Sequence, residues 1–234
     1  MFELAIGLPM QSFAALALHA IGIGPMKRTW IIAFCTGLLI SQCSYACGPG
    51  ATIFDTDFNS NGGQWRPDEA LKFGPTGGTV VFARHWEDFR IMSSATAQGN
   101  SDWCMRASFP PVAENSAAIA LLFWMRDGAN YYSLQITQAG KAMIWRQYMG
   151  ISIKLLETNS EAIRTGPEAI NELRVRAGAR LLTAYINGAR VLEIGVPIPG
   201  ETLGFGFHLH LDAPSDSVKG REFRLARYKV TAAE

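Results

Sequence analysis

From Ala51 onward, apolar and polar residues alternate along the chain, and turn-forming residues recur every eight to twelve positions. A period of two is that of a β-strand, in which successive side chains point to opposite faces. Turn signals at this spacing are typical of a β-sandwich or barrel. The dipeptide Asn187-Gly188, which favours a type I′ hairpin turn, joins two such runs. The sequence therefore predicts an all-β, antiparallel fold.

The expected strands follow one another without an intervening repeat, linker or low-complexity tract. Segment 117–126 is apolar up to its last residue, Arg126, so we expect both of its faces to be covered. This organisation predicts a single domain over 47–234. The expected strands lie at 79–83, 89–92, 117–126, 131–136, 142–146, 151–156, 171–177, 181–186, 189–194, 203–211 and 222–230.

Residues 1–46 differ from the rest, because they hold only three formal charges, Glu3, Lys27 and Arg28. Segment 26–46 combines that basic pair with a short apolar run and ends Ser44-Tyr45-Ala46, which is the pattern of a secretory signal. Its apolar run is too short to span a bilayer comfortably. Two interpretations of 1–25 stay open: an upstream extension before a start at Met26, or a first transmembrane helix over 4–24. We expect export to the periplasm or the extracellular space, and the transmembrane helix is the alternative to it.

The charge balance constrains the partners. The whole chain carries a net charge of +1, and residues 47–234 hold nineteen cationic and nineteen acidic side chains. A nucleic-acid partner requires a surplus of Lys and Arg on one face, so we do not expect one. Membrane contact is expected only through the signal segment or a lipid anchor.

Two cysteines, Cys47 and Cys104, remain after the signal segment. An exported compartment permits a disulfide, which makes Cys47–Cys104 the candidate pair. Alternatively, Cys47 directly follows a small residue after the apolar run, as the lipidated cysteine of a bacterial lipoprotein does. Ser44-Tyr45-Ala46-Cys47 fits that pattern poorly, and both alternatives stay open.

A series of turn and strand-core motifs runs along the chain in a recognisable order. They are Asp57-Phe58, 123–132, Gly140, Arg146, Gly150, 171–175, 185–188 with Val191, 203–205 and Phe223. This order resembles the concanavalin A-like (laminin-G-like) jelly-roll superfamily, and within it the exported bacterial domains related to 3-keto-disaccharide hydrolases. The resemblance implies two stacked antiparallel sheets, one of them curved, with a concave face on which relatives bind sugars.

Catalytic motifs are not evident in the sequence. The Glu-x-Asp-x-x-Glu strand of laminarinase-like members of the superfamily is absent, and Glu87 and Asp88 are adjacent, so on a strand they point to opposite faces. The sequence likewise contains no nucleophile elbow, phosphate-binding glycine loop, Cys-x-x-Cys pair or His-Glu-x-x-His helix. We therefore favour a binding protein and assign no catalytic residue.

One polar set stands out at the end of segment 203–211. On a strand, His208, His210 and Asp212 share one face, while the apolar residues between them share the other. These side chains could bind sugar hydroxyls or, as an alternative, chelate a divalent metal. They could equally form a solvated sheet face. His85 could join them from another loop.

A second set combines aromatic and charged side chains. Alternation places Trp124 and Arg126 on one face of 117–126, and Asp127, Tyr131, Trp145 and Arg146 follow on the next turns and strands. Aromatic rings can stack on sugar rings, and Arg and Asp supply directional hydrogen bonds. The alternative is that the aromatic side chains fill the space between two sheets and the charged residues pair with each other.

The sequence thus predicts an exported β-sandwich that binds carbohydrate or a glycoconjugate on its concave face, without a cofactor. A glycoside hydrolase of the 3-keto-disaccharide hydrolase type is one alternative. The other is a structural or protein-interaction module of the cell envelope.

Overall fold

The computed structural model describes residues 47–66, 68–82, 87–112, 116–166, 168–178, 180–212 and 220–233. The predicted signal segment 1–46 and His85 lie outside the described residues. The described residues form fourteen strands and no helix. No helix long and apolar enough to cross a membrane occurs in the described part of the chain.

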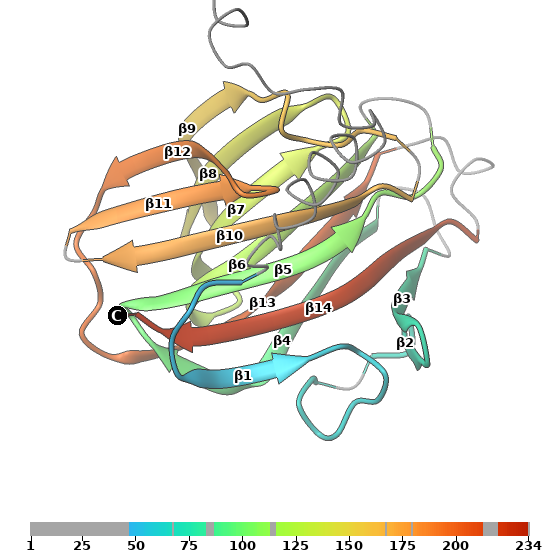
Figure 1. The fold of residues 1–234 in the computed structure, drawn as a ribbon, viewed down its shortest axis with the longest axis horizontal. Coiled ribbons are helices and arrows are strands. Elements are labelled where there is room, and N and C mark those ends of the chain that lie inside the picture. The colour runs from blue at the N-terminus through green and yellow to red at the C-terminus, as the bar shows by residue number, and fades with distance from the viewer. Residues whose placement is uncertain are drawn as a thin grey trace, which may run out of the picture. The chain divides into compact units, whose positions relative to one another are not determined.

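The first layer is an eight-stranded sheet in the order β12-β11-β10-β5-β14-β3-β2, with β1 paired to β14 beside β3. Every pairing in it is antiparallel. In Figure 1, β10, β5 and β14 cross the front of the sandwich. The strands are β1 (Thr52–Thr56), β2 (Leu71–Gly74), β3 (Gly77–Val81), β5 (Ser101–Ser108), β10 (Ile170–Gly178), β11 (Leu181–Ile186), β12 (Ala189–Gly195) and β14 (Glu222–Ala232).

The second layer is a six-stranded antiparallel sheet in the order β4-β13-β6-β7-β8-β9, which lies behind the first in Figure 1. The two layers confirm the all-β, two-sheet antiparallel sandwich. The structure adds β1, β2 and β5 to the expected strands. The six strands are β4 (Glu87–Gln98), β6 (Ala117–Asp127), β7 (Asn130–Thr137), β8 (Lys141–Tyr148), β9 (Ile151–Asn159) and β13 (Thr202–Leu211).

The core between the sheets is rich in aromatic side chains. Trp65 contacts the rings of Phe54, Phe58, Phe207 and Tyr228 at centroid distances of 5.2–5.5 Å. These contacts join β1 and β14 of the first sheet to β13 of the second. Large buried rings account for much of the burial that holds two sheets together.

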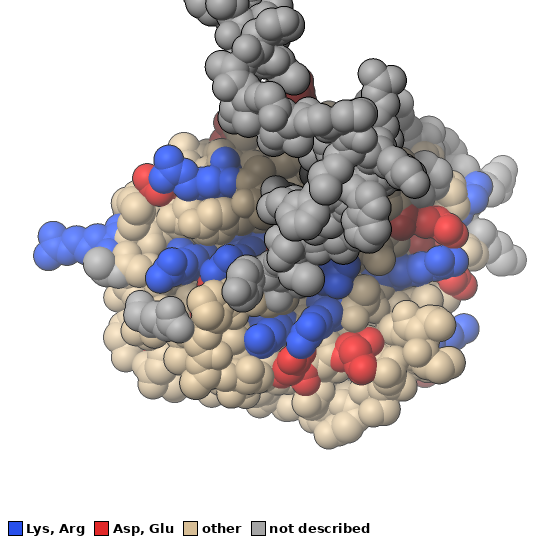
Figure 2. All heavy atoms as spheres, in the orientation of Figure 1, with Lys and Arg blue, Asp and Glu red and all other residues tan. Residues whose placement is uncertain are grey.

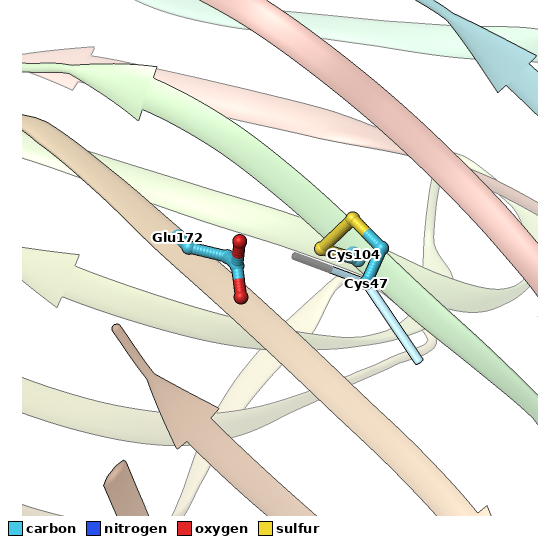
Figure 3. Close-up of side chains that lie close together, drawn as sticks. All are labelled: Cys47, Cys104 and Glu172. Atoms are coloured by element: carbon cyan, nitrogen blue, oxygen red, sulfur yellow. A yellow bond between two sulfur atoms is a disulfide. The ribbon is translucent and has the colours of Figure 1, made fainter. Parts of the chain in front are cut away.

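A disulfide between Cys47 and Cys104 lies on the outer face of the eight-stranded sheet, with 5.3 Å between the two Cα atoms. Cys104 lies in β5, where its neighbours Trp103 and Met105 point into the core. The carboxylate of Glu172, on β10, points toward this disulfide (Figure 3). Burial raises the pKa of Glu172 above its ordinary value, although the nearby Arg106 and Arg174 oppose that rise.

The same outer face carries many Lys and Arg side chains, with acidic side chains beside some of them (Figure 2). Arg174 donates two hydrogen bonds of 3.0 Å from Nε to the buried Asp102 carboxylate, and Arg227 binds Asp55 through both Nε and Nη2. Bidentate pairs of this kind neutralise cations within the sheet. The pairing agrees with the absence of a surplus positive charge in the sequence.

Candidate functional site

A β-bulge in β6 changes the predicted orientation of Trp124. Its φ of 52° lies in the left-handed region, and the register with β7 shifts between Phe123 and Asp127. An extra residue in one strand reverses the alternation beyond it. Trp124 therefore joins the core, where it is 3% exposed and contacts Trp103 and Phe123. Simple alternation would place Trp124 opposite Phe123, whereas the bulge turns both side chains into the core. Trp124 and Arg126 still line the same pocket.

A pocket of about 500 Å³ opens beside this bulge, between the β6–β7 and β8–β9 hairpins and the segment 197–203. We call it the aromatic pocket. It brings together Trp124, Arg126, Tyr131 and Arg146 from the predicted set. Its lining residues are Trp124, Arg126, Asn130, Tyr131, Tyr132, Arg146, Gln147, Tyr148, Pro197, Ile198, Pro199, Gly200, Glu201 and Leu203.

Arg146 is held between two aromatic rings of the aromatic pocket. Its guanidinium carbon lies 5.7 Å from the ring centroid of Tyr132 and 4.8 Å from that of Tyr148. Arg146 is the register partner of Tyr132 on the neighbouring strand, so the two side chains share a face. Stacking fixes the plane of the guanidinium while leaving its N–H groups available as directional donors.

The ion pair of Arg126 and Glu201 separates the aromatic pocket from an adjacent hollow of about 690 Å³. Both residues line both spaces. The adjacent hollow also contains Asp127 and runs along β4 and β13 past Met92 and Gly204. The two spaces thus adjoin each other at this ion pair.

Asp127 and Trp145 lie close to the aromatic pocket but outside its lining. The Asp127 carboxylate accepts hydrogen bonds from the amide of Ala129 and the side chain of Asn130, and these bonds lower its pKa. It therefore holds the β6–β7 turn. Trp145 lies on the other face of β8, and Lys154 Nζ is 5.8 Å from its ring centroid. The buried Nε1 of Trp145 has no hydrogen-bond partner among the described residues.

His208 and His210 lie together on the outer face of the six-stranded sheet, while Phe207 and Leu209 point into the core. Both imidazoles bond to one oxygen of Asp88 on β4, at 3.0 Å from His208 Nε2 and 2.7 Å from His210 Nδ1. We call these three residues the histidine cluster. The hydrogen bond from His208, with that from His210, holds the pKa of Asp88 well below its usual range.

The acidic residue of the histidine cluster is Asp88, and not the expected Asp212. Strand β13 ends at Leu211, and the amide of Asp212 donates to Ser116 O at 2.6 Å, beyond the end of the ladder. Asp88 is instead the register partner of His210. The sequence contained Asp88, but only the pairing of β4 with β13 reveals its role.

The histidine cluster is not arranged as a metal site. In the described part of the chain, only Cys47, Cys104 and Glu172 form a group of three possible ligands within 4.8 Å of one another. Those two sulfur atoms are joined to each other (Figure 3), whereas metal ions bind the thiolate. The donor sets of both groups therefore fit a metal ion poorly.

The chain is similar to known proteins in its structure and not in its sequence. No family model and no curated protein sequence matches the chain. The carbohydrate-binding module CBM66 from Bacillus subtilis superposes with a TM-score of 0.56 at 15% identity, over 74% of this chain and 99% of that one. The β-glucanase of Bacillus licheniformis gives 0.57 at 11% identity, over 80% and 100% of the two chains. The laminarinase catalytic domain of Thermotoga maritima gives a TM-score of 0.61 at 8% identity, over 80% of this chain and 100% of that one.

The fold is a concanavalin A-like jelly roll. The three superpositions confirm the jelly-roll fold that the order of motifs predicts, and identities of this size concern the fold alone. Several lining residues of the aromatic pocket were not predicted from the sequence, among them Glu201 and Pro199. Both lie in segment 197–203, which carries no sequence signal for a place beside the β6–β7 and β8–β9 hairpins.

Proposed function

We propose that this domain binds a carbohydrate or glycoconjugate in the aromatic pocket. The observation that carries the proposal is the placement of Arg146 between Tyr132 and Tyr148 in a pocket of about 500 Å³. Aromatic rings stack on the C–H faces of pyranose rings, and a fixed guanidinium donates to ring hydroxyls. The pocket also offers the amide side chains of Asn130 and Gln147 as donors and acceptors.

A screen of immobilised glycans, followed by calorimetry with any ligand found, tests the proposal. Arg146→Lys keeps the charge but removes the planar fork, so we expect affinity to fall at least tenfold. Tyr148→Ala removes one ring of the stack and should have a similar effect. The matched control is Arg190→Lys, an exposed arginine on β12 paired with Glu193. Absence of glycan binding, or equal affinity in Arg146→Lys and the control, would refute the proposal.

A glycoside hydrolase is the second candidate, and the histidine cluster is the observation that favours it. Asp88 orients two imidazoles, which are groups that can transfer protons near neutral pH. However, the usual glycosidase mechanism requires two carboxyl groups, one of them protonated. Asp88 is held in its ionised form, and Glu201 is the one carboxylate among the described lining residues of the aromatic pocket. Binding is therefore our first choice.

We further propose that the chain is exported and acts in the periplasm or outside the cell. Residues 26–46 supply the signal pattern, and the disulfide of Cys47 with Cys104 suits an oxidising compartment. Cell fractionation with mass spectrometry of the purified protein tests this proposal. A lipid on Cys47 and a bond from Cys47 to Cys104 exclude each other, so the mass also distinguishes a lipoprotein from a free exported domain.

A further inference from the structure

The turn that joins β8 to β9 exposes an unusual amount of apolar surface. Met149 is 71% exposed and Ile151 66%, and Tyr148 and Ile153 beside them are also exposed. Tyr148 is the register partner of Ile151, and Arg146 that of Ile153, so these side chains share one face. We call residues 148–153 the apolar tip. Single exposed apolar residues are ordinary, but a contiguous group marks an interaction surface.

Met149 occupies a backbone conformation that favours other residues. Its φ is 51° and that of Gly150 is 81°, as in a type I′ hairpin turn. Asn, Asp and Gly are the usual residues at the first of these positions, and a Met there is strained. The chain thus places a large apolar side chain where a small polar one would be more stable. Strain at an exposed position points to a use for the side chain.

The apolar tip is held rigidly in place. The amide of Met149 donates to Asn130 Oδ1 at 3.0 Å, and the amide of Gly150 donates to Ala129 O at 3.1 Å. Both acceptors belong to the β6–β7 turn, which Asp127 secures. Two neighbouring hairpin turns therefore support each other. A fixed apolar tip loses little conformational entropy when it is covered.

The residues behind the apolar tip carry aromatic rings and positive charge. Trp145, Arg146 and Lys154 lie further down the hairpin, with cation–π contacts from Arg146 to Tyr148 and from Lys154 to Trp145. Segment 141–157 holds one acidic residue, Glu157, which forms ion pairs with Lys141 and Lys154. With Arg146 as the third cation, the segment keeps a net charge of +2. From the tip, the aromatic ring of Tyr148 comes first and the cations Arg146 and Lys154 follow. An apolar end, then an aromatic ring, then cations is the order in which side chains meet the hydrocarbon, interface and headgroup layers of a bilayer.

We propose that the apolar tip inserts into the interface of a lipid bilayer that contains anionic phospholipid, with Arg146 and Lys154 at the headgroups. This contact is separate from the signal segment and the possible lipid anchor, and it does not depend on sugar binding. It would place the aromatic pocket, which Tyr148 also lines, at the membrane surface.

Vesicle partitioning of the full chain tests the proposal. We compare wild type with Met149→Asn and Ile151→Thr on vesicles of phosphatidylcholine and phosphatidylglycerol. Asn suits the positive φ, and Thr suits a strand, so both variants should fold. Residues 1–46 are the same in all chains, so their contribution cancels. We expect partitioning to fall about tenfold or more in each variant, as the loss of one buried apolar side chain implies.

Controls come from the other sheet. Ile53→Thr and Leu181→Thr alter side chains that are 41% and 39% exposed, and they should leave partitioning unchanged. A photoreactive benzoylphenylalanine in place of Met149 gives a local readout that the N-terminal segment does not affect. Lipid adducts at position 149, with none when the probe replaces Ile53, support the proposal. Adducts that link two copies of the chain, adducts to a protein, or no adduct at all would overturn it, as would equal partitioning of all variants.

Discussion

The indole nitrogen of Trp124 donates a 2.7 Å hydrogen bond to the carbonyl oxygen of Gly99. Gly99 lies in the turn between β4 and β5, and Trp124 lies at the bulge of β6, so the bond joins two parts of the sandwich. A Cβ placed on Gly99 would be only 1.9 Å from Pro199 O, which shows how closely that turn approaches segment 197–203. Trp124 and Gly99 together support the wall of the aromatic pocket.

Removal of the Trp124 donor should destabilise the domain. Trp124→Phe leaves the Gly99 carbonyl without this bond, which costs about 1–3 kcal/mol in the free energy of unfolding. Trp103→Phe is the matched control, because Trp103 is equally buried and its Nε1 has no hydrogen-bond partner among the described residues. Urea unfolding of both variants measures the difference. Equal losses would show that the hydrogen bond contributes nothing beyond packing.

Gly99→Ala should damage both the stability of the domain and the aromatic pocket. The added methyl group meets a backbone oxygen, so segment 197–203 or the β4–β5 turn must move, at a cost of about 1–3 kcal/mol. Gly178→Ala serves as the control, because among the described residues no atom beyond its chain neighbours lies within 4 Å of its added Cβ. Thermal unfolding and ligand titration of both variants check this prediction. It fails if Gly99→Ala behaves like the control.

The disulfide should make a large contribution to stability. Cys47 and Cys104 are 57 residues apart, and closing a loop of that length stabilises a fold by about 4 kcal/mol in the chain-entropy model. We therefore expect a lower melting temperature after reduction and in the Cys47→Ser, Cys104→Ser double variant. An unchanged melting temperature, with an intact mass that corresponds to two free thiols, would contradict the bond.

Glu172→Gln should stabilise the domain at neutral pH. Burial raises the pKa of Glu172 above its ordinary value of 4.5, so the folded state favours the protonated carboxyl. Stability from this group is present at low pH and is lost as the pH rises through the folded-state pKa. A neutral glutamine avoids that loss. We expect a higher melting temperature than wild type at pH 8 and a smaller difference at pH 4. A gain that is the same at both pH values would contradict this explanation.

Periodicity alone predicts much of this fold. Phe205, Phe207, Leu209 and Leu211 are fully buried, and the intervening His208 and His210 face outward, as two-residue alternation requires. Burial of one face fixes the register of such a strand. The sequence offered Cys47 and Cys104 as the candidate disulfide pair, with lipidation of Cys47 as the open alternative, and the structure joins the two sulfur atoms.

Features that depend on long-range register were not predictable. The bulge at Trp124 has no local signal in an apolar strand, although a single inserted residue reverses the facing of the side chain. Asp88 meets His210 only because β4 pairs with β13, across 122 positions of sequence. Segment 197–203 holds no strand before Thr202, so its place beside Arg126 and Tyr148 follows from tertiary contacts alone.

The bond from Cys47 to Cys104 also determines how the domain would respond to mechanical load. Cys104 lies in β5, which is paired on both sides, with β10 and β14. A pull through the chain that precedes Cys47 would therefore enter the middle of the eight-stranded sheet. With the bond reduced, the same pull would reach β1, which pairs along one side only, and would peel it from β14 one residue at a time. When the two cysteines are oxidised, the force therefore acts on many hydrogen bonds of β5 at once; when they are reduced, it breaks those between β1 and β14 one after another.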